Sequence, residues 1–355
     1  MTSGKTPKAL LVAMVASLAA CSSGSPAASP AEPSASTTEF VTPSQAASLT
    51  ASGSPTAMPV PTPAPLTSEA LRELVTVAGV REHLEALQGI ADHNGGNRAT
   101  GTSGFDATVD YVEQRLSAAG YEVERQDFAV GDVSSTTLLV ETGGPGDEVA
   151  MFGAHLDSVP AGPGINDNGS GVAALLVVAE RMAERAPPNR PLRFAFWGAE
   201  EGGTHGSAAY VSRLTDAERD RIGAYVNFDM LGSPNFIRFV YADAGAAPGS
   251  DRLVAMFGDY FDDQGLAWES IDLTGHADHG AFMAAGVPTS GLFSGGAEAK
   301  TDLQAAAFGG TAGAFADACS HLACDTIANL SDFALDQMAD AVAHAVATLG
   351  ARPAD

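Results

Sequence analysis

Residues 149–155 read VAMFGAH, residues 171–184 read GVAALLVVAERMAE, and residues 192–197 read LRFAFW. Apart from Arg193 and the final His155, the first and last of these runs are apolar, which is typical of central strands buried on both faces of a sheet. A glycine-bounded helix between two such strands is the βαβ pattern of an α/β fold. These three segments therefore predict a mostly parallel sheet that is covered by helices on both faces.

Weaker patterns extend this arrangement along the chain. Apolar residues at helical spacing predict further helices over 80–90, 103–116 and 331–349, with Ser103 as the N-cap of the second. Alternating or short apolar runs predict strands at 121–124, 136–141, 224–228, 237–241 and 289–293. No internal repeat is visible. The sequence thus predicts a single α/β domain over residues 69–355.

The charge balance narrows the choice of partners. The chain has 355 residues, of which 18 are basic and 43 are acidic, so its formal net charge is −25 at pH 7. Nucleic acids and anionic membrane surfaces attract basic proteins, and this composition argues against both as partners. Lys5 and Lys8 precede the apolar run ALLVAMVASLAA at 9–20. That run is too short to span a bilayer and has the length of the apolar part of a signal peptide.

The end of this run resembles a bacterial lipobox. Residues 18–21 read LAAC, and the lipobox cysteine is lipidated and becomes the first residue of the mature protein, so Cys21 is the candidate lipidation site. Ordinary cleavage near Ala20, with Cys21 incidental, stays open. Residues 21–68, rich in Ser, Thr, Ala and Pro, predict a disordered tether. We therefore expect a signal peptide over 1–20 and an exported protein, either secreted or anchored as a lipoprotein at the extracellular face of the membrane.

The remaining cysteines agree with export. Besides Cys21, the chain has only Cys319 and Cys324, a close pair that we expect to form a disulfide in an oxidising compartment. Two free buried thiols are the alternative. His321 lies between the two cysteines, and a short disulfide loop would hold it in one orientation.

Residues that can bind metals follow the predicted strands. His155 ends one strand and Asp157 lies two residues further on, so Asp157 can accept a proton from the imidazole while its other nitrogen binds a metal. Glu200 and Glu201 come directly after the next apolar strand, and Asp229 follows another. Open α/β sheets bind their ligands at the carboxyl ends of the strands, so we expect these side chains to share one site.

A glycine-rich loop, GINDNGSG at 164–171, adds Asp167, whose two oxygens could bridge two cations. The loop lacks the spacing of nucleotide-binding motifs, and no GxSxG or HExxH motif occurs in the chain. Histidine and carboxylate donors without thiolates suit a catalytic zinc site. The adjacent Glu200 and Glu201 could divide the work, one binding metal and the other taking a proton from water.

Five segments resemble, in order and spacing, the two-zinc bacterial leucyl aminopeptidases of the aminopeptidase Y family, especially the small secreted enzymes of actinomycetes. They read GAHLDSVPAGPGINDNGSGVAALL (153–176), FWGAEEGGTHGSAAYV (196–211), VNFDMLG (226–232), ADHGAFMAAGVPTSGLFSG (277–295) and CSHLACD (319–325). HNGGNR at 93–98 is similar to a further family segment. The resemblance implies a zinc-exopeptidase-like fold and a hydrolase that releases one N-terminal residue at a time from peptides.

The resemblance also implies two zinc ions held by five ligands, with one carboxylate shared: His155, Asp167 and Asp229 at one ion, and Asp167, Glu201 and His321 at the other. Glu200 would be the general base for a water activated by both ions, and Asp157 would orient a ligand. Phe293 would line the pocket for the first side chain, which implies a preference for large apolar residues such as Leu, Met or Phe. His276 would contact the substrate near its amino end.

Three features depart from the family pattern. Ser320 stands where the family has a Tyr that stabilises the oxyanion. His276 and Ala277 stand where related enzymes have Arg and Ser. Asp336 and Asp340, one helical turn apart, match two carboxylates of a calcium site, but no third acidic residue matches it. Calcium is therefore a further candidate cofactor beside zinc.

Two alternatives remain open. One is glutaminyl cyclase or carboxypeptidase chemistry on the same fold. The other is a catalytically impaired surface lipoprotein that binds peptides, which Ser320 and Ala277 would favour. The presence of Glu200 favours the aminopeptidase, because a binding protein has no need of a base. The expected partners are peptides with a free N-terminus, membrane contact only through the N-terminal lipid, and no nucleic acid; we expect a monomer.

Overall fold

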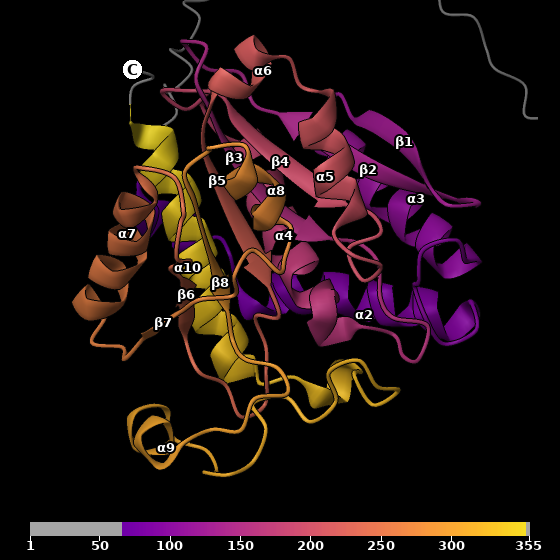
Figure 1. Cartoon of the computed structure of the whole chain (residues 1–355), viewed down its shortest axis with the longest axis vertical. Coiled ribbons are helices and arrows are strands. Elements are labelled where there is room, and N and C mark those ends of the chain that lie inside the picture. Colours follow the sequence, from indigo (N-terminus) through magenta and orange to yellow (C-terminus); the bar gives the residue numbers. More distant parts are fainter. Residues whose placement is uncertain (1–65, 353–355) are drawn as a thin grey trace, which may run out of the picture. The chain divides into compact units, whose positions relative to one another are not determined.

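The computed structural model describes residues 66–352, which form one α/β domain around an eight-stranded sheet (Figure 1). Across the sheet the strands follow the order β1 (Glu124–Val130), β2 (Val133–Glu141), β4 (Leu192–Trp197), β3 (Val149–His155), β5 (Ile222–Asp229), β8 (Thr289–Phe293), β6 (Phe239–Tyr241) and β7 (Glu269–Ile271). The predicted signal peptide, Cys21 and nearly all of the predicted tether lie outside the described residues.

The sheet is parallel at its centre and mixed toward its edges. β4, β3, β5 and β8 run parallel to one another, as the prediction requires. β2 is antiparallel to β4, β1 to β2, and β6 to β8, while β7 runs parallel to β6. β1 and β2 form a hairpin joined by two residues, a connection that only antiparallel strands allow. The centre of the sheet is therefore parallel, as predicted, whereas antiparallel strands join it toward both edges.

Helices cover both faces of this sheet. The larger core contains side chains of α2 (Val77–His93), α3 (Ser103–Ala118), α4 (Gly171–Ala183), α7 (Ser250–Asp263) and α10 (Asp332–Ala351). α5 (His205–Arg213) and α8 (His279–Ala284) pack on the opposite face, in a smaller core around Trp197 and Tyr225. The short helices are α1 (Ser68–Arg72), α6 (Asp216–Asp220) and α9 (Asp302–Phe308). Two single turns complete the domain, η1 (Ile165–Ser170) and η2 (Ile327–Asn329).

Some local details differ from the prediction. The N-cap of α3 is Thr102, whose hydroxyl accepts the backbone N–H of Phe105, so Ser103 is the first helical residue rather than the cap. α7 is absent from the prediction, although buried Leu253 and Phe257 mark its apolar face. None of the helices between residues 66 and 352 combines the length and apolar character that a membrane-spanning segment needs.

Aromatic packing joins the central strands. Phe152 of β3 is fully buried, and its ring stacks against Phe194 of β4 at 5.9 Å and Phe228 of β5 at 6.3 Å between centroids. On the other face, Tyr225 of β5 stacks on Phe282 of α8 at 3.9 Å. The strand ends that carry the candidate site residues therefore extend from a tightly packed centre.

Replacing Phe152 with Ala should lower the free energy of unfolding by about 3–5 kcal/mol, because the variant loses buried apolar surface and leaves a cavity. Urea denaturation measures this change. Leu303→Ala is the control, since Leu303 is 83% exposed, and it should change stability by less than about 0.5 kcal/mol. Similar losses in the two variants would contradict a central role for the aromatic stack.

Candidate metal centre

Five residues that are far apart in the sequence meet at the carboxyl edge of the parallel strands. His155 ends β3, Asp229 ends β5, Asp167 lies in η1, Glu201 follows β4, and His321 follows β8 at a distance along the chain. They form two groups of donors that share Asp167, one with His155 and Asp229 and the other with Glu201 and His321. Within each group, one donor atom per residue lies within 4.8 Å of the others.

The two oxygens of Asp167 face two different histidines. Nε2 of His155 lies 3.4 Å from Oδ1 of Asp167 and 3.6 Å from Oδ1 of Asp229. Nε2 of His321 lies 3.1 Å from Oδ2 of Asp167 and 3.2 Å from Oε2 of Glu201. Oδ1 of Asp229 and Oε1 of Glu201 are buried without a hydrogen-bond partner among the described residues. Buried acceptors of this kind, in a set of nitrogen and oxygen donors, fit bound zinc.

The carboxylates also change the acidity of their neighbours. Hydrogen bonds to Asp167 and Glu201 raise the pKa of His321 to about 11. Burial opposes a charge on His155, but the negative charge of Glu200 and contacts with other carboxylates raise its pKa well above the usual range. Burial raises the pKa of Glu200 as well. The cluster therefore attracts positive charge, which bound cations would supply in place of protons.

Asp157 holds the two adjacent glutamates in place. Its Oδ1 accepts the backbone N–H of Glu200 at 3.0 Å, and its Oδ2 accepts that of Glu201 at 3.3 Å. Nδ1 of His155 lies 3.1 Å from the main-chain oxygen of Asp157 and 3.7 Å from its carboxylate. The predicted pairing of imidazole and carboxylate is thus mainly a contact with the main chain, because the carboxylate already accepts two N–H groups. Asp157 links the ends of β3 and β4.

The disulfide between Cys319 and Cys324 is confirmed. It closes the loop that carries His321, and the N–H of Leu322 donates to the carbonyl oxygen of Cys319 at 2.9 Å within this loop. His321 has a φ of 60°, a left-handed conformation that is uncommon for a residue with a side chain. The loop thus holds a half-exposed histidine against buried carboxylates.

Asp325 ties this loop to the loop of Asp167, and no sequence pattern marks it for that purpose. Its Oδ1 accepts the backbone N–H of Asn166 at 2.7 Å, and its Oδ2 accepts that of Asp167 at 3.0 Å. The N–H of Ile165 donates to the carbonyl oxygen of Asp325 at 3.2 Å. Its position directly after Cys324 was the one available signal. These bonds set the distance between the two loops that carry His321 and Asp167.

Asn168 is a second positioning residue without a sequence signal. Its side-chain amide donates to the carbonyl oxygen of Phe228 at 2.8 Å and accepts the N–H groups of Gly171 at 2.9 Å and Met230 at 3.3 Å. Phe228 and Met230 flank Asp229. Asn168 therefore connects the backbone on both sides of one candidate ligand to the loop that carries another.

Arg98 is a buried cation behind the site. Its guanidinium donates to the carbonyl oxygens of Leu156, Pro163 and Gly164, which belong to the chain between β3 and η1. Arg98 is the last residue of the HNGGNR segment, whose role the sequence left undefined. Its charge lies near the carboxylates of Asp157 and Asp325, so it partly offsets their repulsion.

A cavity of about 420 Å³ opens over the two groups of donors. Glu200 and both predicted substrate-binding residues, Phe293 and His276, line it. Ser320 and Glu298 line the same cavity beside His321. The structure therefore brings the candidate base, the candidate ligands and the predicted substrate contacts together around one open space.

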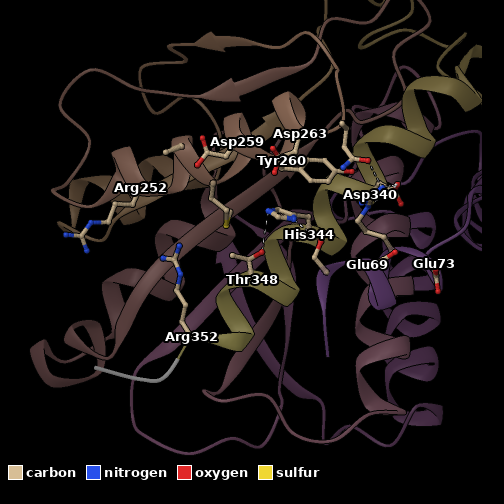
Figure 2. A pocket seen from close by; sticks show the side chains of 15 residues that line it. Glu69, Glu73, Arg252, Asp259, Tyr260, Asp263, Asp340, His344, Thr348 and Arg352 are labelled. Carbon is tan, nitrogen blue, oxygen red and sulfur yellow. Dashed lines mark hydrogen bonds and ion pairs between the residues drawn. The ribbon is translucent and has the colours of Figure 1, made fainter. Parts of the chain in front are cut away.

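The larger cavity shown in Figure 2, of about 1010 Å³, lies elsewhere, among residues of α1, α7 and α10. Asp340, one of the two predicted calcium carboxylates, lines it and accepts hydrogen bonds from the Arg72 guanidinium at 3.0 and 3.2 Å. Figure 2 shows His344 beside Tyr260, and their rings stack at 4.5 Å. Asp336 is exposed. Asp340 therefore already has a cationic partner within the chain.

Fold and site together define an α/β protein with a candidate metal centre at the carboxyl edge of its sheet. The chain belongs to peptidase family M28, whose family model matches residues 137–346. Leupeptin-inactivating enzyme 1 of Streptomyces exfoliatus is 44% identical over 280 residues, which are 78% of this chain and 63% of that protein. An aminopeptidase of Pseudomonas aeruginosa (strain UCBPP-PA14) is 45% identical over 209 residues, which are 57% of this chain and 39% of the relative. The chain thus spans less than two thirds of the length of these curated relatives.

Solved structures of low sequence identity share the fold. An aminopeptidase from Aneurinibacillus sp. strain AM-1 aligns with a TM-score of 0.65 at 17% identity, over 81% of this chain and 97% of that one. A glutaminyl cyclase of Porphyromonas gingivalis aligns with a TM-score of 0.62 at 18% identity, over 78% of this chain and 99% of that one. The expected zinc-exopeptidase-like architecture is therefore confirmed, and the likeness shows the fold alone.

Replacing Asn168 with Ala should lower the free energy of unfolding by about 2–4 kcal/mol, because the variant loses the buried side-chain hydrogen bonds to the carbonyl oxygen of Phe228 and to the N–H groups of Gly171 and Met230. Urea denaturation measures the loss. Asn189→Ala is the matched control: Asn189 is exposed, its side chain donates to the carbonyl oxygen of Ala351, and its loss should cost less than about 1 kcal/mol. Equal effects would show that Asn168 is no more important than a surface amide.

Proposed function

We propose that the protein is a zinc-dependent aminopeptidase that releases N-terminal residues, preferably large and apolar ones, from peptides. The observation that carries this proposal is the position of Glu200. Its carboxylate lines the cavity over both donor groups, lies 3.8 Å from Nε2 of His155, and has a pKa raised by burial. A carboxylate of this kind is suited to take a proton from water. Membership of family M28 and relatives whose names include aminopeptidase support the proposal.

The proposed ligands form two sets with Asp167 as the bridge: His155, Asp167 and Asp229, and Asp167, Glu201 and His321. When bound, the two zinc ions would lower the pKa of a water molecule and polarise the scissile carbonyl. Glu200 would accept the proton of the attacking water and return it to the leaving amine. Asp157 would keep Glu200 aligned through the backbone N–H groups that it accepts. Phe293 would contact the first side chain, and His276 the substrate near its amino end.

Two further points concern the cofactors and the rate. We do not propose calcium at Asp336 and Asp340, because the guanidinium of Arg72 already pairs with Asp340.

Ser320 in place of a phenol implies one oxyanion donor fewer, and such a donor is worth on the order of 100–1000-fold in rate. We therefore propose slow but genuine turnover.

Glutaminyl cyclisation is the second candidate, favoured by the similarity in fold to a glutaminyl cyclase. A cyclase converts an N-terminal glutamine without releasing a free amino acid, so the products separate the two reactions. Two complete donor groups around one base favour the hydrolase, which must activate a water as well as the carbonyl.

The zinc-loaded protein should release residues one by one from the N-terminus of a leucine-containing peptide, and a chelator should abolish the release. Glu200→Gln should keep the fold and two zinc ions per chain, but its kcat should fall by about 100- to 10,000-fold, since the variant lacks the base. Amino-acid analysis of the products, metal analysis and circular dichroism of both proteins measure these outcomes. Glu85→Gln, an exposed change on α2, is the control.

Full turnover by Glu200→Gln would contradict the assignment of the base. Release from the C-terminus, or formation of a pyroglutamyl product without any free amino acid, would contradict the aminopeptidase itself. Binding of peptides without any product would favour the impaired binding protein.

We also infer that the protein is exported and acts as a monomer, either secreted or attached to the extracellular face of the membrane by a lipid on Cys21. The sequence at 9–21 supports export, and so does the Cys319–Cys324 disulfide, because such bonds persist in oxidising compartments. The membrane would be contacted through the lipid alone.

Replacing Cys21 with Ser should move the protein from the membrane fraction to the soluble fraction of the cells or medium, because the acyl chains that hold it would be absent. Cell fractionation followed by immunoblotting measures the shift. Ser22→Ala, next to the proposed lipidation site, should stay with the membranes. An unchanged distribution of Cys21→Ser would defeat the lipid anchor.

A further inference from the structure

We propose that Glu298 makes the pocket for the first substrate residue accept basic side chains, those of lysine and arginine, in addition to apolar ones. This inference rests on the proposed aminopeptidase function and specifies its substrate class. Glu298 lines the cavity over the candidate metal centre, on the same side as Phe293 and Ser320.

Three side chains converge at Gly296. A Cβ atom at this position would lie 3.5 Å from Cζ of Phe293, 3.6 Å from Oε2 of Glu298 and 3.8 Å from Oγ of Ser320. An aromatic ring, a carboxylate and a hydroxyl therefore surround the same small volume, which the glycine leaves open. A long side chain could lay its apolar stem along the ring and place a cationic end at the carboxylate, as lysine and arginine commonly do.

The carboxylate of Glu298 is held at one oxygen only. Oε1 accepts the backbone N–H of Gly296 at 2.9 Å, and no described basic side chain forms an ion pair with Glu298. The backbone is held as well, since the N–H of Ala316 donates to the carbonyl oxygen of Glu298 at 2.9 Å, next to the β-bridge of Ala299 with Phe315. Oε2 is thus available to a ligand.

The charge balance of the cavity leaves Glu298 without a counter-ion. Two zinc ions would bring four positive charges, which the carboxylates of Asp167, Glu200, Glu201 and Asp229 would balance. Glu298 is a further carboxylate, and neither lysine nor arginine occurs among the described residues that line this cavity. Because Glu298 is exposed, we expect a cationic side chain to gain only a few-fold in kcat/KM from it.

The test compares kcat/KM for the p-nitroanilides of lysine and norleucine, whose side chains share one stem and differ in the terminal charge. In zinc-loaded Glu298→Gln, the lysine-to-norleucine ratio should fall about three- to fivefold relative to wild type, while norleucine changes less than about twofold. Gln keeps an oxygen that can accept the N–H of Gly296, so this part of the cavity wall should keep its structure in the variant. Glu298→Asp should retain part of the ratio. Glu85→Gln should leave it unchanged.

The outcomes separate the two proposals. An unchanged ratio in Glu298→Gln, with norleucine still released, overturns the role of Glu298 and leaves the aminopeptidase intact. Equal losses for both substrates would also overturn it, because Glu298 would then support the wall without selecting charge. A wild-type protein that releases neither residue would remove both proposals.

Discussion

Several negative charges must lie within a few ångströms of one another at the carboxyl edge of the sheet, and much of the surrounding structure serves this constraint. Buried carboxylates are costly unless hydrogen bonds or opposite charges stabilise them. Asp157 and Asp325 each accept two backbone N–H groups, and those groups belong to the residues that carry or adjoin the candidate ligands. The fully buried guanidinium of Arg98 adds one positive charge behind them. The cations that the remaining carboxylates attract would complete the balance.

The sheet and the loops divide the work of positioning. Strands packed on both faces hold His155 and Asp229, because their backbones continue from a close-packed aromatic centre. Asp167 and His321 lie outside the strands, in a tight turn and a disulfide loop that Asp325 joins. The same disulfide loop contributes Ser320 to the part of the cavity wall where Glu298 also lies. The proposed substrate preference and the proposed metal binding would therefore depend on the same neighbouring loops.

The sequence predicted the centre of the fold better than its edges. The bounds of β3, β4 and β8 match the structure because continuous apolar runs mark strands that are buried on both sides. β7 was not predicted, because a short strand at the edge of the sheet carries little apolar pattern. The antiparallel direction of β2 against β4, and of β6 against β8, was not predicted either, because the direction in which a strand pairs depends on its neighbours in the sheet. α7 carried a readable apolar face that the prediction overlooked.

By itself, the sequence determined a set of residues able to bind metal and the strands that bring several of them to one edge, and the family resemblance implied Glu200 as the base. The set of residues and the strands follow from residue type and from hydrophobic periodicity, which are local. Only the tertiary structure decided that Arg72 pairs with Asp340 and that Glu298 lies beside Phe293. It also decided that Asn168 and Asp325 bind backbone groups 60 and 159 residues away. Such contacts depend on the paths of loops, and polar residues in loops have no periodicity from which their partners can be read.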